Sequence, residues 1–264
     1  VEVLGELEVF VREASAQYHN IKDEDIQFSV YEFNKRLLAI LPDHLSNWAT
    51  KLLRKRGINI HTGVSVKEVH TDHIVDSNAE VVPCSTVIWT AGIAPSPMLK
   101  NLEGLPLNKF GGMQCESDYQ ATGTTNIWGM GDCASVPGRD GKPMPPLAQI
   151  AIRQAPQLAA NIAATEQGRP TKPGGVELQG ILVPLGRHRG VAAIKGLRVH
   201  GILAWLMWRG IYLMKTPRFG RRLRVLVDWM LNALCRKDYV QLGMHAASHR
   251  DMIRPKPDER SSQD

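Results

Sequence analysis

The pattern of apolar and polar positions over the first 95 residues predicts alternating helices and strands. Apolar residues at 3, 4, 7, 10, 11 and 14 repeat with the helical period, whereas the run 26–31 alternates as a strand does. Helices are therefore expected over 1–18 and over 45–56, where Gly57 ends the helix, and strands over 26–31, 58–62, 64–69, 73–75 and 86–90. This order predicts most of a parallel nucleotide-binding unit that lacks its first strand.

The second half of the chain is less regular until a long alanine-rich helix. Residues 105–134 are loop-rich and end in a predicted strand over 126–132. After a Pro/Gly loop, a helix is expected over 147–165, which Pro156 should kink or divide. Further along, the pattern predicts a linker over 168–180, two strands at 181–185 and 191–194 that could pair, and apolar runs at 202–214 and 223–234.

Basic residues are concentrated in one block of an otherwise mildly acidic chain. The 264 residues carry a net charge of +6, and 43% are apolar and 22% charged, which excludes a disordered or low-complexity protein. Between Leu178 and Val227 there are ten Lys or Arg and no Asp or Glu, while the rest of the chain carries a net −4. Such a block predicts a polyanionic partner, either nucleic acid or an anionic membrane face.

The two C-terminal apolar runs are too short and too basic to cross a bilayer, which requires about 20 mostly apolar residues. Aromatic side chains beside clustered arginines instead favour a helix that lies in the membrane interface, with its indoles at headgroup level. The alternative is a buried domain helix whose basic residues are solvated. The residues predicted to contact the membrane are Trp205, Trp208, Arg209, Tyr212, Arg221, Arg222 and Trp229.

Disulfide and metal chemistry are both disfavoured. The four cysteines show neither Cys-x-x-Cys nor a paired metal spacing, and the nine histidines show no metal-ligand spacing, so no metal site is predicted. Cys133 is expected to be a small buried residue rather than a nucleophile. The opening Val1-Glu2-Val3 does not begin a signal peptide, and it indicates a chain cut in mid-fold.

Two segments carry the strongest signal for a ligand. The strand over 126–132 ends in Gly131-Asp132, where the glycine permits close approach and the carboxylate suits the hydroxyls of a ribityl or ribose chain. Fifteen residues after Asp132, a helix opens at Leu147, and its free N–H groups would stabilise electron density on a reduced flavin ring. A simple turn and an ordinary proline-initiated helix are the alternatives. Together the two segments favour a flavin site.

Five segments match one family in order and with sensible spacing: Val1–Leu7 (VEVLGEL), Arg36–Pro42 (RLLAILP), Thr86–Pro95 (TVIWTAGIAP), Asn126–Ala134 (NIWGMGDCA) and Pro145–Gln154 (PPLAQIAIRQ). They resemble type II NADH:quinone oxidoreductase, the single-subunit, non-proton-pumping NADH dehydrogenase of the two-dinucleotide-domain flavoproteins. The resemblance covers roughly residues 1–243. It implies an α/β fold of two Rossmann-like dinucleotide-binding domains, both incomplete here, with a C-terminal amphipathic helical segment that docks on a membrane.

The same resemblance implies a domain organisation. Residues 1–95 would form a partial NADH-binding domain that lacks its first strand and Gly-rich turn, and residues 96–180 would form the C-terminal part of the FAD-binding domain. Residues 181–243 would be the basic, aromatic membrane-docking region. Residues 244–264 are expected to be a disordered tail.

The resemblance also implies roles for individual residues. Glu2 and Gln149 would be catalytic, with Glu2 near the nicotinamide and Gln149 where the nicotinamide and quinone sites meet the flavin. The cofactor-binding residues would be Glu32 at the adenosine ribose, Ala91 and Gly92 at the dinucleotide, Gly131 and Asp132 at the FAD ribityl chain, and Ala148, Gln149, Ala151 and Ile152 at the flavin ring. Gln149 and Ile152 would also contact the quinone.

Each of these polar residues has a structural alternative. Glu2 lies at a helix N-terminus, where the helix dipole favours an acid without any function. Glu32 could be a solvated strand end, and Gln149 could cap the helix or hydrogen-bond locally.

The implied activity is hydride transfer from NADH to FAD and then electron transfer to a membrane quinone. Because both Gly-x-Gly-x-x-Gly turns of the family are absent, the chain as given is expected to be inactive, with the activity belonging to the complete gene product. The expected partners are a membrane quinone, an anionic lipid surface and a second copy as a homodimer, with no nucleic acid. The expected location is peripheral, at the cytoplasmic face of a bacterial cell membrane.

Two alternatives remain open from the sequence. One is a soluble reductase that passes electrons to a small, acidic iron–sulfur protein. The other is a membrane- or nucleic-acid-binding module without catalysis.

Overall fold

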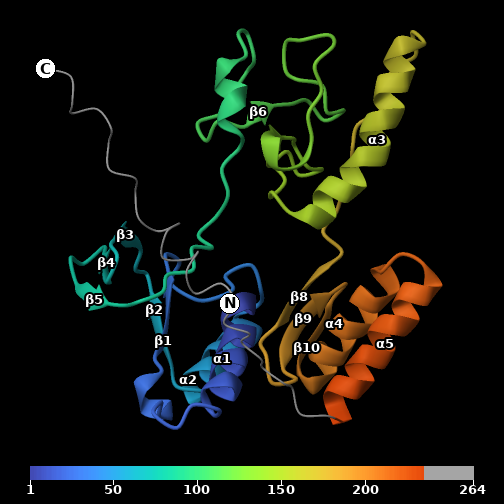
Figure 1. Cartoon of the computed structure of the whole chain (residues 1–264). Coiled ribbons are helices and arrows are strands. Elements are labelled where there is room, and N and C mark those ends of the chain that lie inside the picture. The colour runs from blue at the N-terminus through green and yellow to red at the C-terminus, as the bar shows by residue number, and fades with distance from the viewer. Residues whose placement is uncertain (235–264) are drawn as a thin grey trace, which may run out of the picture.

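The computed structural model describes residues 1–234, and its first part is a pair of parallel strands with two helices (Figure 1). Its elements are α1 (Glu2–Ser15), the 3-10 helix η1 (Asp23–Asp25), β1 (Phe28–Glu32), α2 (Asp43–Lys55), β2 (Ile58–Thr62), β3 (Val66–Val69), β4 (His73–Asp76) and β5 (Val81–Pro83). Strands β1 and β2 pair in parallel, and β3, β4 and β5 form a separate antiparallel sheet. The predicted helices and strands up to residue 76 are confirmed.

Helix α2 forms because its apolar residues recur every fourth position. Leu45, Ala49 and Leu53 share one face of the helix and are fully buried. Asp43 lies in the first turn of the helix and Arg54 in the last turn, where their charges complement the helix dipole. Burial of this apolar face fixes α2 against the body of the molecule.

The middle of the chain is built around one long helix and a small core of loops. Its elements are η2 (Pro97–Asn101), β6 (Met113–Gln114), η3 (Gly131–Cys133), β7 (Ala134–Ser135) and α3 (Ala148–Glu166). The loops are held to α3 by the buried Asn161, whose Nδ2 donates to the carbonyl oxygens of Asp118 and Lys172 at 2.9 and 2.8 Å. The Lys172 N–H donates back to Asn161 Oδ1 at 3.0 Å. One side-chain amide therefore bonds backbone groups of the loops that no helix or strand pairs.

The last part is a three-stranded antiparallel sheet between helices (Figure 1). Its elements are β8 (Gly180–Pro184), β9 (Gly190–Ile194), β10 (Leu197–Gly201), α4 (Ile202–Lys215) and α5 (Phe219–Leu234). Helix α2 packs on β9 and β10, and α4 packs on all three strands. Because successive residues of a strand face opposite sides, the burial of both Val191 and Ala192 shows that both faces of the sheet are covered. The predicted pairing of β8 with β9 is confirmed.

Two predicted strands are absent from the described structure. Residues 86–90 form no strand, because the parallel sheet consists of β1 and β2 alone and neither strand pairs with them. Ile88 and Trp89 are accordingly 50% and 59% exposed. Residues 126–132 form no strand either, since Gly131 has a φ of +65° that turns the chain into η3. Pro156 does not divide its helix, because α3 runs unbroken through it, and the alternative of a kink stays a prediction. Strand β10 was not predicted.

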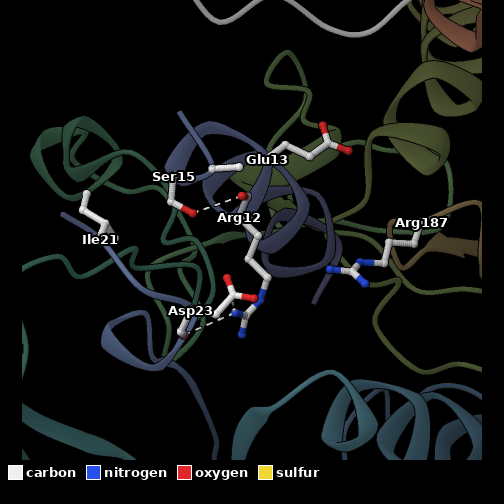
Figure 2. Close-up of a pocket in the computed structure, with 7 residues that line it drawn as sticks. Arg12, Glu13, Ser15, Ile21, Asp23 and Arg187 are labelled. Carbon is white, nitrogen blue, oxygen red and sulfur yellow. Dashed lines mark hydrogen bonds and ion pairs between the residues drawn. The ribbon is translucent and has the colours of Figure 1, made fainter. Parts of the chain in front are cut away.

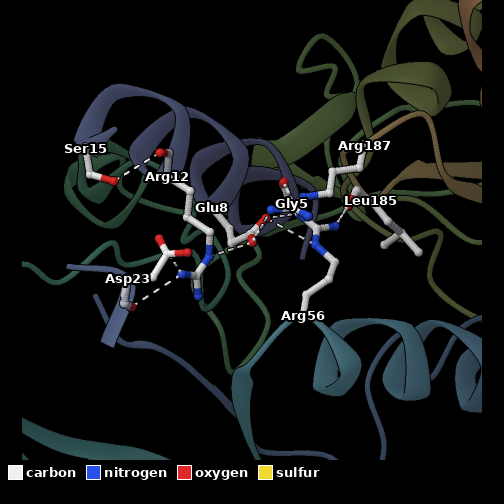
Figure 3. Close-up of polar contacts among 8 residues, drawn as sticks. All are labelled: Gly5, Glu8, Arg12, Ser15, Asp23, Arg56, Leu185 and Arg187. Carbon is white, nitrogen blue, oxygen red and sulfur yellow. Dashed lines mark hydrogen bonds and ion pairs between the residues drawn. The ribbon is translucent and has the colours of Figure 1, made fainter. Parts of the chain in front are cut away.

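A buried carboxylate joins the first and last parts of the molecule (Figure 3). Glu8 of α1 has no exposed side-chain area and accepts from Arg12 Nε at 2.9 Å and from Arg187 Nη2 at 3.2 Å. The nearly buried Arg56, after α2, forms an ion pair with the other oxygen of Glu8. Arg56 also donates to the carbonyl oxygens of Gly5 and of Leu185, which follows β8. These four side chains are called the Glu8 cluster below.

Glycine is required where α1 meets the chain after β8. A β-carbon added at Gly5 would lie 2.5 Å from the carbonyl carbon of Leu185. A β-carbon does not approach another heavy atom this closely in proteins, so any larger residue at position 5 would push α1 away from Leu185. The Glu8 cluster and this close backbone approach together fix α1 against the C-terminal sheet.

We expect Glu8→Gln to destabilise the chain by about 3 kcal/mol, because it leaves Arg56 and Arg12 without their buried counter-charge. Urea unfolding monitored by circular dichroism measures the loss as a lower midpoint at an unchanged slope. The matched control is Glu24→Gln, which removes a partner of Lys22 in a pair whose two side chains are about three-quarters exposed. Its midpoint should stay at the wild-type value. Equal losses in the two variants would show that the Glu8 cluster contributes no more than a surface pair.

Candidate functional site

The Gly131–Asp132 turn lies against the beginning of α3. The positive φ of Gly131 brings its backbone so close to the helix that an added β-carbon would lie 3.2 Å from Cβ of Ala151. The Gly131 N–H donates to Oε1 of Gln154 at 2.8 Å, and Gln154 is only 2% exposed. A buried amide therefore fixes the turn on the helix and brings together the two segments on which the predicted flavin site rests.

The N-terminus of α3 is available to a ligand. Helix α3 begins at Ala148, and Leu147 before it supplies no side-chain cap for the first N–H groups. The exposed carboxylate of Asp132 accepts no hydrogen bond from any residue within 1–234. An uncapped helix N-terminus carries partial positive charge, and a free carboxylate accepts from hydroxyl groups. The site thus suits a ligand that combines a polyol chain with an electron-rich ring.

The other α3 residues predicted at the flavin ring line the same helix start. Ala148 is exposed and Ile152 is 72% exposed, so an apolar ligand could cover both. Gln149 is half-buried, and its Nε2 donates to the carbonyl oxygen of Gly180 at 3.4 Å. This long contact links the helix start to the first residue of β8.

A hollow of about 270 Å³ lies beside that link. Gly180, the acceptor of Gln149, is among its lining residues, and so are the basic Lys195 and Arg198. The other lining residues are mainly apolar or backbone: Pro42, Leu178, Gln179, Ile181, Ala193, Gly196 and Leu197. The hollow is therefore lined mainly by apolar residues and backbone, together with two basic residues.

Glu2 and Glu32 lie near one another at the N-terminus of α1. Both carboxylates raise the pKa of the Val1 α-amino group, which burial lowers by a larger amount. Partial burial likewise raises the pKa of Glu2, and the Val1 amino group opposes that shift. The end of β1 and the start of α1 thus form one acidic corner, as in a dinucleotide-binding unit.

Asn34 orients the carboxylate of Glu32. The Asn34 N–H and its Nδ2 donate to Oε1 of Glu32 at 2.9 and 2.6 Å. The other carboxylate oxygen accepts no hydrogen bond within the described chain and is left for a ligand hydroxyl. Glu32 is therefore held in place rather than solvated freely at a strand end.

The structure places Ala91 and Gly92 neither at the start of α3 nor at the acidic corner of Glu2 and Glu32. Both are exposed, and an added β-carbon at Gly92 would have no neighbour within 4 Å. Their predicted contact with a dinucleotide stays a prediction.

A second hollow, of about 520 Å³, lies on α1 next to the Glu8 cluster (Figure 2). Its walls include Arg12, Glu13, Asp23 and Arg187, so charges of both signs are mixed, and both arginines already bond Glu8. None of the predicted site residues lines it. In residues 1–234 no group of three or more His, Cys, Asp or Glu could hold a metal ion.

The aromatic residues of α4 and α5 are only partly exposed, and their contact with a membrane stays a prediction. Trp205, Trp208 and Trp229 are half-buried rather than exposed, and Trp208 stacks on Tyr212 with ring centroids 4.9 Å apart. Arg221 is exposed, whereas Nε of Arg222 donates to the Thr216 carbonyl oxygen at 2.8 Å. The exposed apolar surface consists instead of Ile202, Leu203, Leu206, Met214, Phe219, Leu223, Leu226, Val227, Met230 and Leu231. We call this set, whose members are aliphatic except for Phe219, the aliphatic face.

Across the described helices, none has the length and apolar character needed to cross a membrane.

Sequence reasoning missed three contributors to these sites. Gln154 was read only as part of a motif, although a glutamine on the same helix face as the buried Ile150 signals a buried hydrogen bond. Asn34, two residues after Glu32, donates both its backbone N–H and its side-chain amide to the Glu32 carboxylate, a local contact that the short sequence separation makes possible. The third contributor is the aliphatic face, because the tryptophans, rather than the aliphatic residues beside them, carried the prediction of membrane contact.

Two family models match the chain. The pyridine nucleotide-disulphide oxidoreductase model matches residues 12–155, and the NDH2 C-terminal domain model matches residues 178–238. The first match covers 144 of the 264 residues. The chain belongs to the pyridine nucleotide-disulphide oxidoreductase family. This oxidoreductase match spans β1, the Gly131–Asp132 turn and the start of α3, which are the elements of the site described above.

Individual relatives agree with the family models. The chain is 30% identical to demethylphylloquinone reductase NdbB of Synechocystis over 208 residues, 78% of this chain and 51% of that protein. It is 26% identical to type II NADH:quinone oxidoreductase of Haemophilus influenzae over 252 residues, 93% of this chain and 57% of that protein. The chain spans about half the length of the curated relatives it matches.

A solved structure shares the fold. NDH2 from Plasmodium falciparum aligns with a TM-score of 0.79 over 91% of this chain and 65% of that chain, at 16% identity. The predicted α/β fold class and the resemblance to type II NADH:quinone oxidoreductase are confirmed. The domain limits at residues 95, 180 and 243 stay predictions, and the predicted tail 244–264 lies outside the described residues.

We expect Gln154→Leu to release the Gly131–Asp132 turn, because the Gly131 N–H loses its buried acceptor. The cost should be about 1–3 kcal/mol, measured as faster hydrogen exchange at the Gly131 amide and a lower unfolding midpoint. Gln157→Leu is the matched control on the same helix, since Asn161 Oδ1, which accepts from Gln157, keeps its bond from the Lys172 N–H. Unchanged exchange at Gly131 in Gln154→Leu would contradict the assignment.

Proposed function

We propose that the protein of which this chain is part transfers a hydride from NADH to FAD and then electrons to a membrane quinone. The observation that carries the proposal is the Gly131–Asp132 turn, held by Gln154 on the uncapped N-terminus of α3. The family membership and the names of the quinone-reducing relatives support the same activity. Bound FAD supplies the redox chemistry, and the residues of this chain bind, orient and enclose it.

In this proposal the FAD ribityl chain lies at Asp132. The free carboxylate accepts from its hydroxyls, and the glycine at 131 lets the backbone approach the cofactor. Ala148, Ala151 and Ile152 at the helix start would hold the flavin ring. The N–H groups of the first turn of α3 there stabilise the negative charge of the reduced ring.

NADH binds at the acidic corner of α1 and β1. The oriented Glu32 accepts from the adenosine ribose hydroxyls and repels a 2′-phosphate, which favours NADH. Arg36, which could otherwise pair with such a phosphate, donates to the carbonyl oxygens of Leu41 and Ala39 at 2.9 Å and pairs with Asp43 at 2.9 Å. Glu2 is proposed to lie near the nicotinamide.

The quinone is proposed to reach Gln149 through the 270 Å³ hollow, because Gly180 both accepts from Gln149 and lines that hollow. The mainly apolar walls suit a quinone ring. Ile152, exposed on the same helix start, would give it further apolar contact. The half-buried amide of Gln149 supplies the polar contact that orients the ring.

The aliphatic face is proposed to dock the protein peripherally on an anionic membrane. Ten side chains of α4 and α5 present exposed apolar area, and the surrounding block of residues from Leu178 to Val227 contains no acid. This arrangement supports docking with the helices in the interface. The cytoplasmic face of a bacterial membrane as the location and a homodimer as the assembly belong to the same proposal.

The first test is the visible spectrum of the chain expressed together with the coding region upstream of Val1. We expect a flavin spectrum that bleaches on addition of NADH and returns on addition of a soluble quinone analogue. A flavin that bleaches but is not reoxidised by quinone would favour a soluble reductase of an iron–sulfur protein. Absence of flavin would contradict the proposed function.

We expect Glu32→Gln in that protein to lower kcat/KM for NADH by about tenfold, since a neutral amide accepts less strongly from the ribose hydroxyls. The ratio of kcat/KM for NADPH to that for NADH should rise, because the carboxylate that repels the 2′-phosphate is gone. The measurement is kcat/KM for both nucleotides. Glu24→Gln, at an exposed glutamate outside the corner, is the control. An unchanged NADPH/NADH ratio in Glu32→Gln would remove Glu32 from nucleotide selection.

A further inference from the structure

The guanidinium of Arg209 is enclosed by two indole rings at the junction of α4 and α5. Its Cζ lies 4.3 Å from the centroid of Trp205, one turn earlier on α4, and 4.3 Å from the centroid of Trp229 on α5. His188, in the turn between β8 and β9, packs edge-on against Trp205 with centroids 4.6 Å apart. We call Trp205, Arg209 and Trp229 the indole pocket.

The N–H donors of Arg209 have no acceptor in the described chain. Its Nε is buried without a hydrogen-bond partner, and no carboxylate of residues 1–234 lies within ion-pair distance of its guanidinium. Burial lowers the pKa of Arg209, and the more distant Glu6 opposes that shift. The terminal nitrogens Nη1 and Nη2 also make no hydrogen bond within residues 1–234, and unlike Nε they are not buried. They are therefore accessible to an anion, whose oxygen atoms would accept from them.

The surroundings of the indole pocket match the boundary between lipid tails and headgroups. Leu206, one turn before Arg209, is 52% exposed, and Leu226 and Met230 beside Trp229 are 41% and 58% exposed. All three belong to the aliphatic face. A planar cation between indoles and next to exposed aliphatic side chains is suited to the headgroup level of a bilayer.

We propose that the indole pocket is a phospholipid headgroup site, in which the edge of Arg209 binds the phosphate oxygens of one anionic lipid. The inference rests on the proposed membrane docking and goes beyond it, because docking by a diffuse basic surface requires no individual site. The two indoles fix the plane of the guanidinium, so that two parallel N–H groups face the phosphate. The aliphatic face beside the pocket then contacts the acyl chains of the same leaflet.

The test is co-sedimentation of the chain with vesicles of phosphatidylcholine containing about one-third phosphatidylglycerol. We compare Arg209→Lys and Arg209→Gln with Arg224→Lys and Arg224→Gln, since Arg224 is an exposed arginine on α5 outside the indole pocket. A diffuse surface charge contributes about 1 kcal/mol, or about fivefold in affinity, for each basic residue. We therefore expect Arg224→Lys to bind as wild type and Arg224→Gln to lose at most about fivefold.

For Arg209 we expect a loss of more than tenfold in both variants, because a lysine keeps the charge and the contact with the indoles but not the planar pair of donors. Circular dichroism and the unfolding midpoint verify that the Arg209→Lys protein is folded. Inorganic phosphate at millimolar concentration should not compete with the vesicles, which distinguishes a lipid site from a free-phosphate site.

Two results would overturn the inference. If Arg209→Lys binds like wild type, or if the losses at positions 209 and 224 are equal, Arg209 is one charge among many and docking itself is unaffected. If the wild-type chain fails to bind the anionic vesicles, the proposed docking fails together with the site.

Discussion

The buried carboxylate of Glu8 is the constraint on which the arrangement of the described chain depends. It receives guanidinium groups from α1, from the residue after α2 and from the turn after β8, while Arg56 also binds the carbonyl oxygens of Gly5 and Leu185. Burying such charges is costly, and apolar side chains of the same volume would serve stability equally well. The cluster instead fixes one register between α1 and the C-terminal sheet. The acidic corner at the start of α1 and the helices proposed for the membrane therefore share one rigid frame.

A second polar contact performs the same task at the proposed flavin site. The chain around Gly131 has almost no regular secondary structure, so its position depends on the bond to Gln154 and on the amide of Asn161, which anchors Asp118 and Lys172 to the same helix. Buried amides are effective here because each can satisfy several backbone groups of a loop that no strand pairs with. Helix α3 thus serves both as a wall of the proposed site and as the scaffold for the loops that complete it.

The sequence predicted those elements whose periodicity reports local burial. Helices α1, α2 and α3 and strands β1 and β2 follow from apolar spacing alone. The strand expected over 86–90 fails because a strand needs a neighbour, and periodicity records the apolar character of Trp89 but not what lies beside it. The proximity of Gly131 to the start of α3 was predictable from the motif, whereas the bond from Gln154 that maintains it depends on tertiary structure. The indoles of α4 and α5 were assigned to the membrane by residue type, but three-dimensional packing turns two of them toward Arg209.

The packing of α5 gives Arg209 a part in positioning the surface that is proposed to dock on a membrane. Helix α5 packs mainly on α4, so the orientation of its exposed apolar side depends on what holds these two helices together. The stack of Arg209 between Trp205 and Trp229 bridges the two helices with a charged group that no described residue satisfies. A contact based on leucine side chains would have held the helices equally well without placing a charge there. The proposed lipid phosphate would explain the choice of a guanidinium, and its binding would link the orientation of α5 to the membrane.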